Sequence, residues 1–106
     1  MRPRPKFDLI FAPETIEHMK SMDREHHPMI RQTINEQLRY APDKQTRNRK
    51  PLEAPSPFDA TCELRFGSNN RFRVFYEIDE KHKTVNILAI GTKDRNRLLI
   101  AGEEFK

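Results

Sequence analysis

Three runs rich in β-branched and aromatic residues dominate the second half of the chain. They cover residues 60–66, 71–78 and 84–91, and the connections Gly67–Asn70 and Asp79–Lys83 are polar and short enough for hairpins. Runs of this composition, separated by turns of this length, predict an antiparallel meander of three strands.

Alternation within the first two runs assigns their side chains to two faces of the predicted sheet. One face receives the apolar positions Cys62, Leu64, Phe66, Phe72, Val74, Tyr76 and Ile78. The opposite face receives Glu63, Arg65, Arg71, Arg73, Phe75 and Glu77. We therefore expect one apolar face that packs on a core and one cationic face that stays open.

The first half of the chain predicts a short strand over residues 7–11, followed by two helices. Pro13 suits the first turn of a helix, and Ile16 and Met19 give that helix a narrow apolar stripe. A second helix opens at Pro28 and runs to Tyr40, with apolar residues at four-residue spacing: Ile30, Ile34 and Leu38. The expected fold class is α+β, with two N-terminal helices packed on one face of a small, mainly antiparallel four-stranded sheet.

Residues 41–59 have no clear period, hold four of the chain's eight prolines and form a long predicted loop. The loop carries one basic run, made of Lys44, Arg47, Arg49 and Lys50. One interpretation is a solvated, semi-rigid connector. The interpretation we favour is contact with a phosphate backbone, because a basic sheet face is expected nearby.

Composition narrows the class of protein without choosing a partner. The 106 residues form one predicted domain, 1–106, with 35% hydrophobic residues and a net charge of +4, which permits a polyanion partner. A single cysteine, Cys62, excludes an internal disulfide and fits a reducing compartment. No segment approaches transmembrane length, so we expect a cytoplasmic protein with no membrane partner.

Four segments in order carry a family resemblance: 64–66, the Arg-rich strand 71–76, the apolar strand 87–91 and the basic segment 93–97. This combination resembles the core of the RelE/ParE toxin superfamily, the small toxins of type II toxin–antitoxin modules. The resemblance implies a microbial-ribonuclease-type fold and an antitoxin that wraps the core in a hetero-oligomer. For the RelE branch it also implies cleavage of mRNA in the decoding site of the 70S ribosome, without a metal or another cofactor.

The resemblance also implies roles for residues of the cationic face. Arg73 matches the strand arginine that contacts the scissile phosphate, although a strand arginine in this position can simply pair with Glu63 or Glu77. Lys93 falls where the RelE branch has an arginine after the glycine that ends the last strand. The catalytic candidates are Arg73, Lys93, Arg65, Arg95 and Glu63. The RNA-binding candidates are Lys44, Arg47, Arg49, Lys50, Arg71 and Arg97.

Two departures from the RelE pattern affect the expected chemistry. The tyrosine that is important for RNA cleavage in that branch falls at Leu99, and Phe105 replaces it only if the tail folds back. Glu53 and Glu63 are the candidates for a general base. The histidines do not form a two-histidine ribonuclease site, because His26 and His27 are adjacent and the others lie on separate elements.

Preorganised cations at a phosphate can carry RNA cleavage without histidine, because one well-placed electrostatic donor contributes on the order of 10²–10³ in rate. Together with the resemblance, the expected basic face makes a ribosome-dependent mRNA endonuclease toxin the leading hypothesis. Two alternatives remain: a ParE-like toxin that inhibits gyrase, which Leu99 favours, and a catalytically inactive nucleic-acid-binding protein with the same fold.

Overall fold

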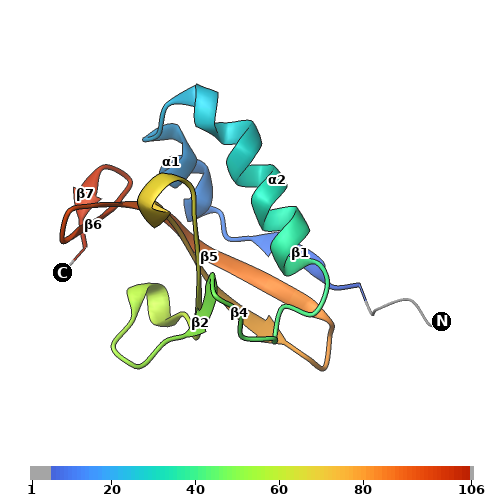
Figure 1. Cartoon of the computed structure of the whole chain (residues 1–106). Helices are drawn as coiled ribbons and strands as arrows, with labels where there is room; N and C mark the ends of the chain where they lie inside the picture. The colour runs from blue at the N-terminus through green and yellow to red at the C-terminus, as the bar shows by residue number, and fades with distance from the viewer. Residues whose placement is uncertain (1–5, 106) are drawn as a thin grey trace.

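The computed structural model of the chain describes residues 6–105, in which one mixed sheet carries two helices on one side (Figure 1). The strands are β1 (Asp8–Phe11), β2 (Arg49–Pro51), β3 (Cys62–Phe66), β4 (Phe72–Asp79), β5 (Thr84–Asp94), β6 (Arg97–Ile100) and β7 (Glu103–Glu104). The α-helices are α1 (Glu14–Lys20) and α2 (His27–Leu38), and the 3-10 turns are η1 (Arg24–His26), η2 (Pro57–Asp59) and η3 (Ser68–Asn70).

The sheet is seven-stranded, in the order β2-β3-β4-β5-β6-β7, with β1 paired in parallel to the long strand β5. The α+β class and the mainly antiparallel pairing are confirmed, whereas the expected four-stranded sheet is wrong. Only α2 is a long helix, since α1 has seven residues. The strands missing from the prediction, β2, β6 and β7, have two to four residues each, too few for alternation to show.

The main core lies between the helices and the sheet. The stripe Ile30, Ile34 and Leu38 is fully buried against Leu64 and Val74 of the meander, as the alternation predicted. The end of α2 is closed by a side chain from the long loop, because Arg49 Nη1 donates to the carbonyls of Gln37 (2.6 Å) and Ala41 (3.2 Å). Such bonds satisfy carbonyls that a helix end leaves unpaired.

The opposite face of the sheet is only partly open, so the expectation of an open face is wrong over part of its area. A second apolar cluster covers part of it, made of Ala60, Phe75, Ala89 and Ile100 with Leu52 packed against them. The segment 51–61 lies on this side of the sheet, opposite the helices (Figure 1). Alternation tells which side of a strand a residue faces, but not whether a loop returns to cover that side.

No helix within residues 6–105 is both long enough and apolar enough to cross a membrane.

A buried histidine completes the hydrogen bonding of β5 between its pairings with β1 and β6. The Nδ1 atom of His18 accepts the backbone N–H of Ile90 at 3.2 Å, and its ring lies 5.6 Å from that of Phe58. Burial lowers the pKa of His18 below its usual 6.5, and the nearby Glu14 carboxylate opposes that shift. A neutral ring can accept this bond, whereas a protonated ring cannot.

We therefore expect part of the folding free energy to depend on the protonation of His18. Because the folded-state pKa is lowered, this contribution is present above the unfolded value of 6.5 and is lost as the pH falls below it. Urea unfolding of His18→Gln and of the wild type between pH 7.5 and pH 5 should show a smaller loss of stability in the variant. The exposed His82→Gln is the control, and equal losses in His18→Gln and wild type would contradict the assignment.

Candidate functional site

An open pocket of about 710 Å³ lies where the start of β4, the end of β5 and the β5–β6 turn meet. We call it the basic pocket, and its lining is Ser68, Asn69, Arg71, Arg73, Thr92, Lys93, Asp94, Arg95, Asn96 and Leu99. Four cationic side chains against one carboxylate give it a positive potential that attracts anions. The structure thus brings together Arg73, Lys93, Arg95 and Arg71 of the predicted residues.

Strand pairing sets the position of these side chains. Arg73 lies opposite Gly91 in the β4–β5 ladder, and the Lys93 N–H donates to the Arg71 carbonyl at 2.7 Å. A side chain at position 91 would not fit, because its Cβ would lie 2.6 Å from the backbone oxygen of Leu99. Glycine therefore lets β6 approach β5 closely beside Arg73, which places the β5–β6 turn at the rim of the basic pocket.

Arg73 is held from behind by two acceptors. Its Nε donates to the Asn70 carbonyl at 2.8 Å, and its Nη1 lies 3.4 Å from Glu63 Oε2. Asn70 and Asn69 adopt left-handed backbone conformations (φ 53° and 56°), which asparagine tolerates better than most residues. The turn before β4 can therefore bend so that the Asn70 carbonyl meets the guanidinium. The interpretation in which Arg73 pairs with Glu63 is correct, and Arg73 also lines the basic pocket.

Glu63 is buried between two guanidinium groups. It is 5% exposed, and its Oε1 accepts from Arg65 Nε at 2.6 Å while Oε2 faces Arg73. Arg65 and Arg73 are direct partners across the β3–β4 ladder, which brings two positive charges close together. The Glu63 carboxylate between them reduces the repulsion of these charges. Neither Glu63 nor Arg65 lines the basic pocket. Glu63 contacts Arg73 directly, whereas Arg65, whose side chain is 33% exposed, contacts Glu63.

The other cations of the basic pocket are exposed. The Arg71 guanidinium lies 5.0 Å above the ring of Phe72, which orients it by a cation–π contact. Arg97 does not line the pocket and pairs at 3.8 Å with Asp94, in an exposed contact that contributes little to stability. This pairing with Arg97 partly neutralises the Asp94 carboxylate, the one negative charge in the lining of the basic pocket.

The basic run of the long loop does not join this pocket. Lys44 and Arg49 line a separate hollow with Tyr40 and Lys83, near the start of β5. Ten residues of extended chain separate Lys83 from Lys93, which corresponds to about 30 Å along the strand.

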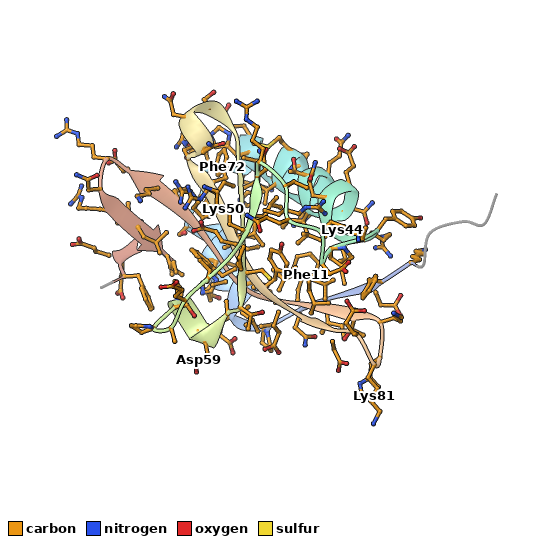
Figure 2. The ribbon with its side chains drawn as sticks, turned by 60° about the horizontal axis from the view of Figure 1, so that its bottom comes forward. Phe11, Lys44, Lys50, Asp59, Phe72 and Lys81 are labelled. Atoms are coloured by element: carbon orange, nitrogen blue, oxygen red, sulfur yellow. The ribbon has the colours of Figure 1, made fainter. Side chains whose placement is uncertain are left out.

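The remaining two residues of the run, Arg47 and Lys50, are exposed, and Lys50 pairs with Glu63 across the β2–β3 ladder. In Figure 2, Lys50 lies on β2 in the middle of the view, whereas Lys44 lies further along, beside the end of α2. The four basic residues are close in sequence, but they do not gather at one place, because the loop that carries them bends around the sheet.

Leu99 lines the basic pocket at the position where the resemblance expects tyrosine, and it is half-buried. The tail does fold back, but Phe105 stacks on Phe58 (ring centroids 6.2 Å apart) and does not line the pocket. Glu53 is exposed in the loop after β2 and also lies outside the lining. Leu99 thus carries no hydroxyl at this position, and the side-chain hydroxyls of the lining are those of Ser68 and of Thr92, which pairs with Leu99 across β5 and β6.

Sequence reasoning missed the turn residues that complete the site. Asn70 supplies the carbonyl that fixes Arg73, and Asn69 and Asn96 line the basic pocket. Their signal was the clustering of Gly, Ser and Asn between apolar runs, which marks a turn but does not reveal what its carbonyls contact.

One group of possible metal ligands occurs in residues 6–105. Ligand atoms of Asp23, Glu25 and His26 lie within 4.8 Å of one another, and Asp23, which precedes η1, and Glu25 within it are both exposed. Exposed acidic groups of this kind are common without a metal, so this group does not support a metal assignment.

Removing the Glu63 charge should destabilise the protein, because it leaves the guanidinium of Arg73 buried without an ionic partner. We expect Glu63→Gln to lower the free energy of unfolding by about 3 kcal/mol, the scale for breaking a buried ion pair. The matched control is Glu77→Gln, which only alters a bond from Asn86 Nδ2 (3.1 Å) on a half-buried side chain. Urea denaturation checks both, and equal losses would show that Glu63 has no special structural role.

Comparison with known proteins shows that this fold has been seen before. A chain of the toxin–antitoxin complex RelBE2 from Mycobacterium tuberculosis matches over 83% of this chain and 92% of that chain, with a TM-score of 0.67 and 22% sequence identity. No family model matches the sequence. No curated protein sequence matches it either. The structural likeness confirms the RelE-like fold that the resemblance implied.

Proposed function

We propose that this chain is the toxin of a type II toxin–antitoxin pair and that it cleaves ribosome-bound mRNA at the basic pocket. The observation that carries the proposal is the convergence of four cations on one pocket, with Arg73 oriented from behind by Glu63 and Asn70. The fold shared with a chain of the RelBE2 complex supports the toxin assignment. The site is of a size and charge suited to an RNA phosphate and its neighbours.

The proposed reaction is an in-line attack of the RNA 2′-hydroxyl on the adjacent phosphorus. The 2′-oxygen loses its proton and bonds to phosphorus, the bond to the 5′-oxygen breaks, and that oxygen takes up a proton, leaving a 2′,3′-cyclic phosphate and a 5′-hydroxyl. Arg73 and Lys93 stabilise the extra negative charge on the phosphate as it develops. The ribosome supplies the orientation of the mRNA, which is a large part of the rate enhancement of positioned reactants.

Glu63 has a positioning role in this proposal rather than that of a general base. A base must come within hydrogen-bond reach of the 2′-hydroxyl, about 2.6–3.2 Å or one water further. Both carboxylate oxygens of Glu63 face guanidinium groups, and the side chain is outside the lining of the basic pocket. Its contribution is to hold Arg73 in one orientation before the substrate binds.

An apolar groove between α1, α2 and β1 is the proposed binding surface for the antitoxin. This helix groove encloses about 590 Å³, and its walls include Phe11 and Ile16, which are 44% and 61% exposed. Its charged lining residues are Lys20, Arg31 and Arg39, with no carboxylate in the lining. An amphipathic antitoxin segment with acidic residues beside its apolar stripe fits this surface in shape and charge.

A second candidate function follows from Leu99. A leucine in the basic pocket can neither donate a hydrogen bond nor stack well on a base, so the site lacks a group that RNA cleavage uses in the RelE branch. The alternative is therefore a ParE-like toxin that inhibits gyrase, or an inactive relative that only binds nucleic acid.

Arg73→Ala should reduce mRNA cleavage by about 10²–10³-fold, because it removes a preorganised cation from the phosphate. Lys93→Ala should have an effect in the same direction. Cleavage is measured by mapping mRNA ends in a translation extract supplied with purified protein. Lys81→Ala, a loss of charge on the exposed β4–β5 hairpin, is the matched control and should leave cleavage unchanged.

Three outcomes would decide against this function. Uncut mRNA together with inhibited supercoiling by purified gyrase would support the ParE-like alternative. Uncut mRNA with no effect on gyrase would support an inactive relative. Full cleavage by Arg73→Ala would show that the chemistry does not occur at the basic pocket.

The helix groove provides a separate test of the antitoxin partner. Phe11→Glu should weaken antitoxin binding at least tenfold, because it puts a carboxylate into an apolar wall that receives an acidic partner. Ile10→Glu is the matched control, since Ile10 is 50% exposed on the same strand but does not line the groove. The antitoxin to test is the product of a neighbouring reading frame, measured by calorimetry. Equal affinities of the two variants would place the antitoxin elsewhere.

A further inference from the structure

A second, smaller hollow adjoins the basic pocket. This side hollow encloses about 180 Å³ between η1 and the sheet, and it shares Arg71, Thr92 and Leu99 with the basic pocket. Phe72, Thr92 and Leu99 are successive partners across β4, β5 and β6, so their side chains form one row on a single face. This row is on the helix side of the sheet, whereas Arg73 and Lys93 belong to the opposite side. A molecule that occupies both cavities therefore passes around the strand ends beside Arg71, which lines both.

The walls of the side hollow suit a flat ring. The Arg71 guanidinium and the His26 imidazole both lie against the Phe72 ring, at 5.0 Å and 5.3 Å from its centroid. Phe72 itself is 3% exposed, so the surfaces offered to a ligand are these two planar groups and the hydrocarbon of Leu99 and Met22. Guanidinium and aromatic planes are the groups on which proteins stack unpaired RNA bases.

One polar group of the side hollow is free to select among bases. Within the part of the chain that the structure describes, the Asp23 carboxylate makes no capping hydrogen bond, although a His26 ring nitrogen and a Glu25 carboxylate oxygen lie within 4.8 Å of it. Ser21 is already committed, because its hydroxyl donates to the His18 carbonyl at 2.7 Å. An ionised carboxylate only accepts hydrogen bonds, and it repels phosphate. It therefore suits the amino group of adenine, cytosine or guanine, whereas uracil has no amino group.

We propose that the side hollow is a nucleobase subsite, filled by a base next to the phosphate in the basic pocket. The base lies against Leu99, stacks on Arg71 or His26, and donates an amino N–H to Asp23. This inference rests on the proposed RNA-cleaving function. The inference also gives a physical role to Leu99, which stands where the resemblance expects tyrosine. Leu99 forms the apolar wall between the two cavities, and Arg71 and His26 supply the planar groups on which a base stacks.

The test is to compare cleavage positions on ribosome-bound mRNA for the wild type, Asp23→Asn and Arg24→Ala. The wild type should disfavour uracil about fivefold or more at one position beside the cut, the low end of discrimination by a base contact. Asp23→Asn should lose this bias but still cut, because an amide both donates and accepts and so also pairs with uracil. Arg24→Ala is the matched control, since Arg24 is exposed on the same turn and lines neither cavity.

A second pair of variants tests stacking. His26→Ala should lower cleavage at all sites, and His26→Phe, which keeps a flat ring, should restore it. Three results would overturn the subsite without contradicting the cleavage function. They are cleavage by the wild type without base bias, a bias that persists in Asp23→Asn, and equal cleavage by the two His26 variants. Absence of cleavage by the wild type would instead overturn the proposed function, and the subsite with it.

Discussion

The Glu63 carboxylate, buried between two arginines on the side of the sheet away from the helices, is the constraint on which the candidate site depends. A charge without a partner is costly in a protein interior, so the burial of Glu63 requires Arg65 and Arg73 to remain beside it. The same requirement acts on Arg73, which is 8% exposed. The guanidinium at the basic pocket is therefore oriented by folding itself, before any anion binds.

This arrangement also makes the strand register matter for function. Residues on β3 and β4 alternate between the helix side and the Glu63 side, and Arg65 is paired directly with Arg73. A slip of one residue in either strand would exchange the two faces and bring charged groups under α2. The apolar stripe of α2 and the buried ion pairs consequently favour the same register, one by burying hydrocarbon and the other by excluding unpaired charge.

The two surfaces proposed to bind partners lie at different places but share one strand. Ile90 of β5 lines the helix groove, and Lys93, three residues further on, lines the basic pocket. That separation is about 10 Å along an extended chain. Ile90 packs on the helix side of β5, whereas Lys93 belongs with Gly91 to the opposite side. The helix groove and the cations of the basic pocket are therefore close along β5 but lie on different faces of the sheet.

The class of the fold and the buried faces of the central strands and α2 could be predicted from the sequence, because short-range periodicity is expressed by each segment alone. The grouping of Arg73 and Lys93 in one basic region was implied by the family resemblance and not by periodicity. Only the tertiary structure decided that segment 51–61 covers part of the second face, that Arg49 closes α2 far from Lys93, and that η1 brings His26 beside Arg71. The physical reason is that loops without a period take their positions from the surfaces on which they pack, and those surfaces exist only in the folded chain.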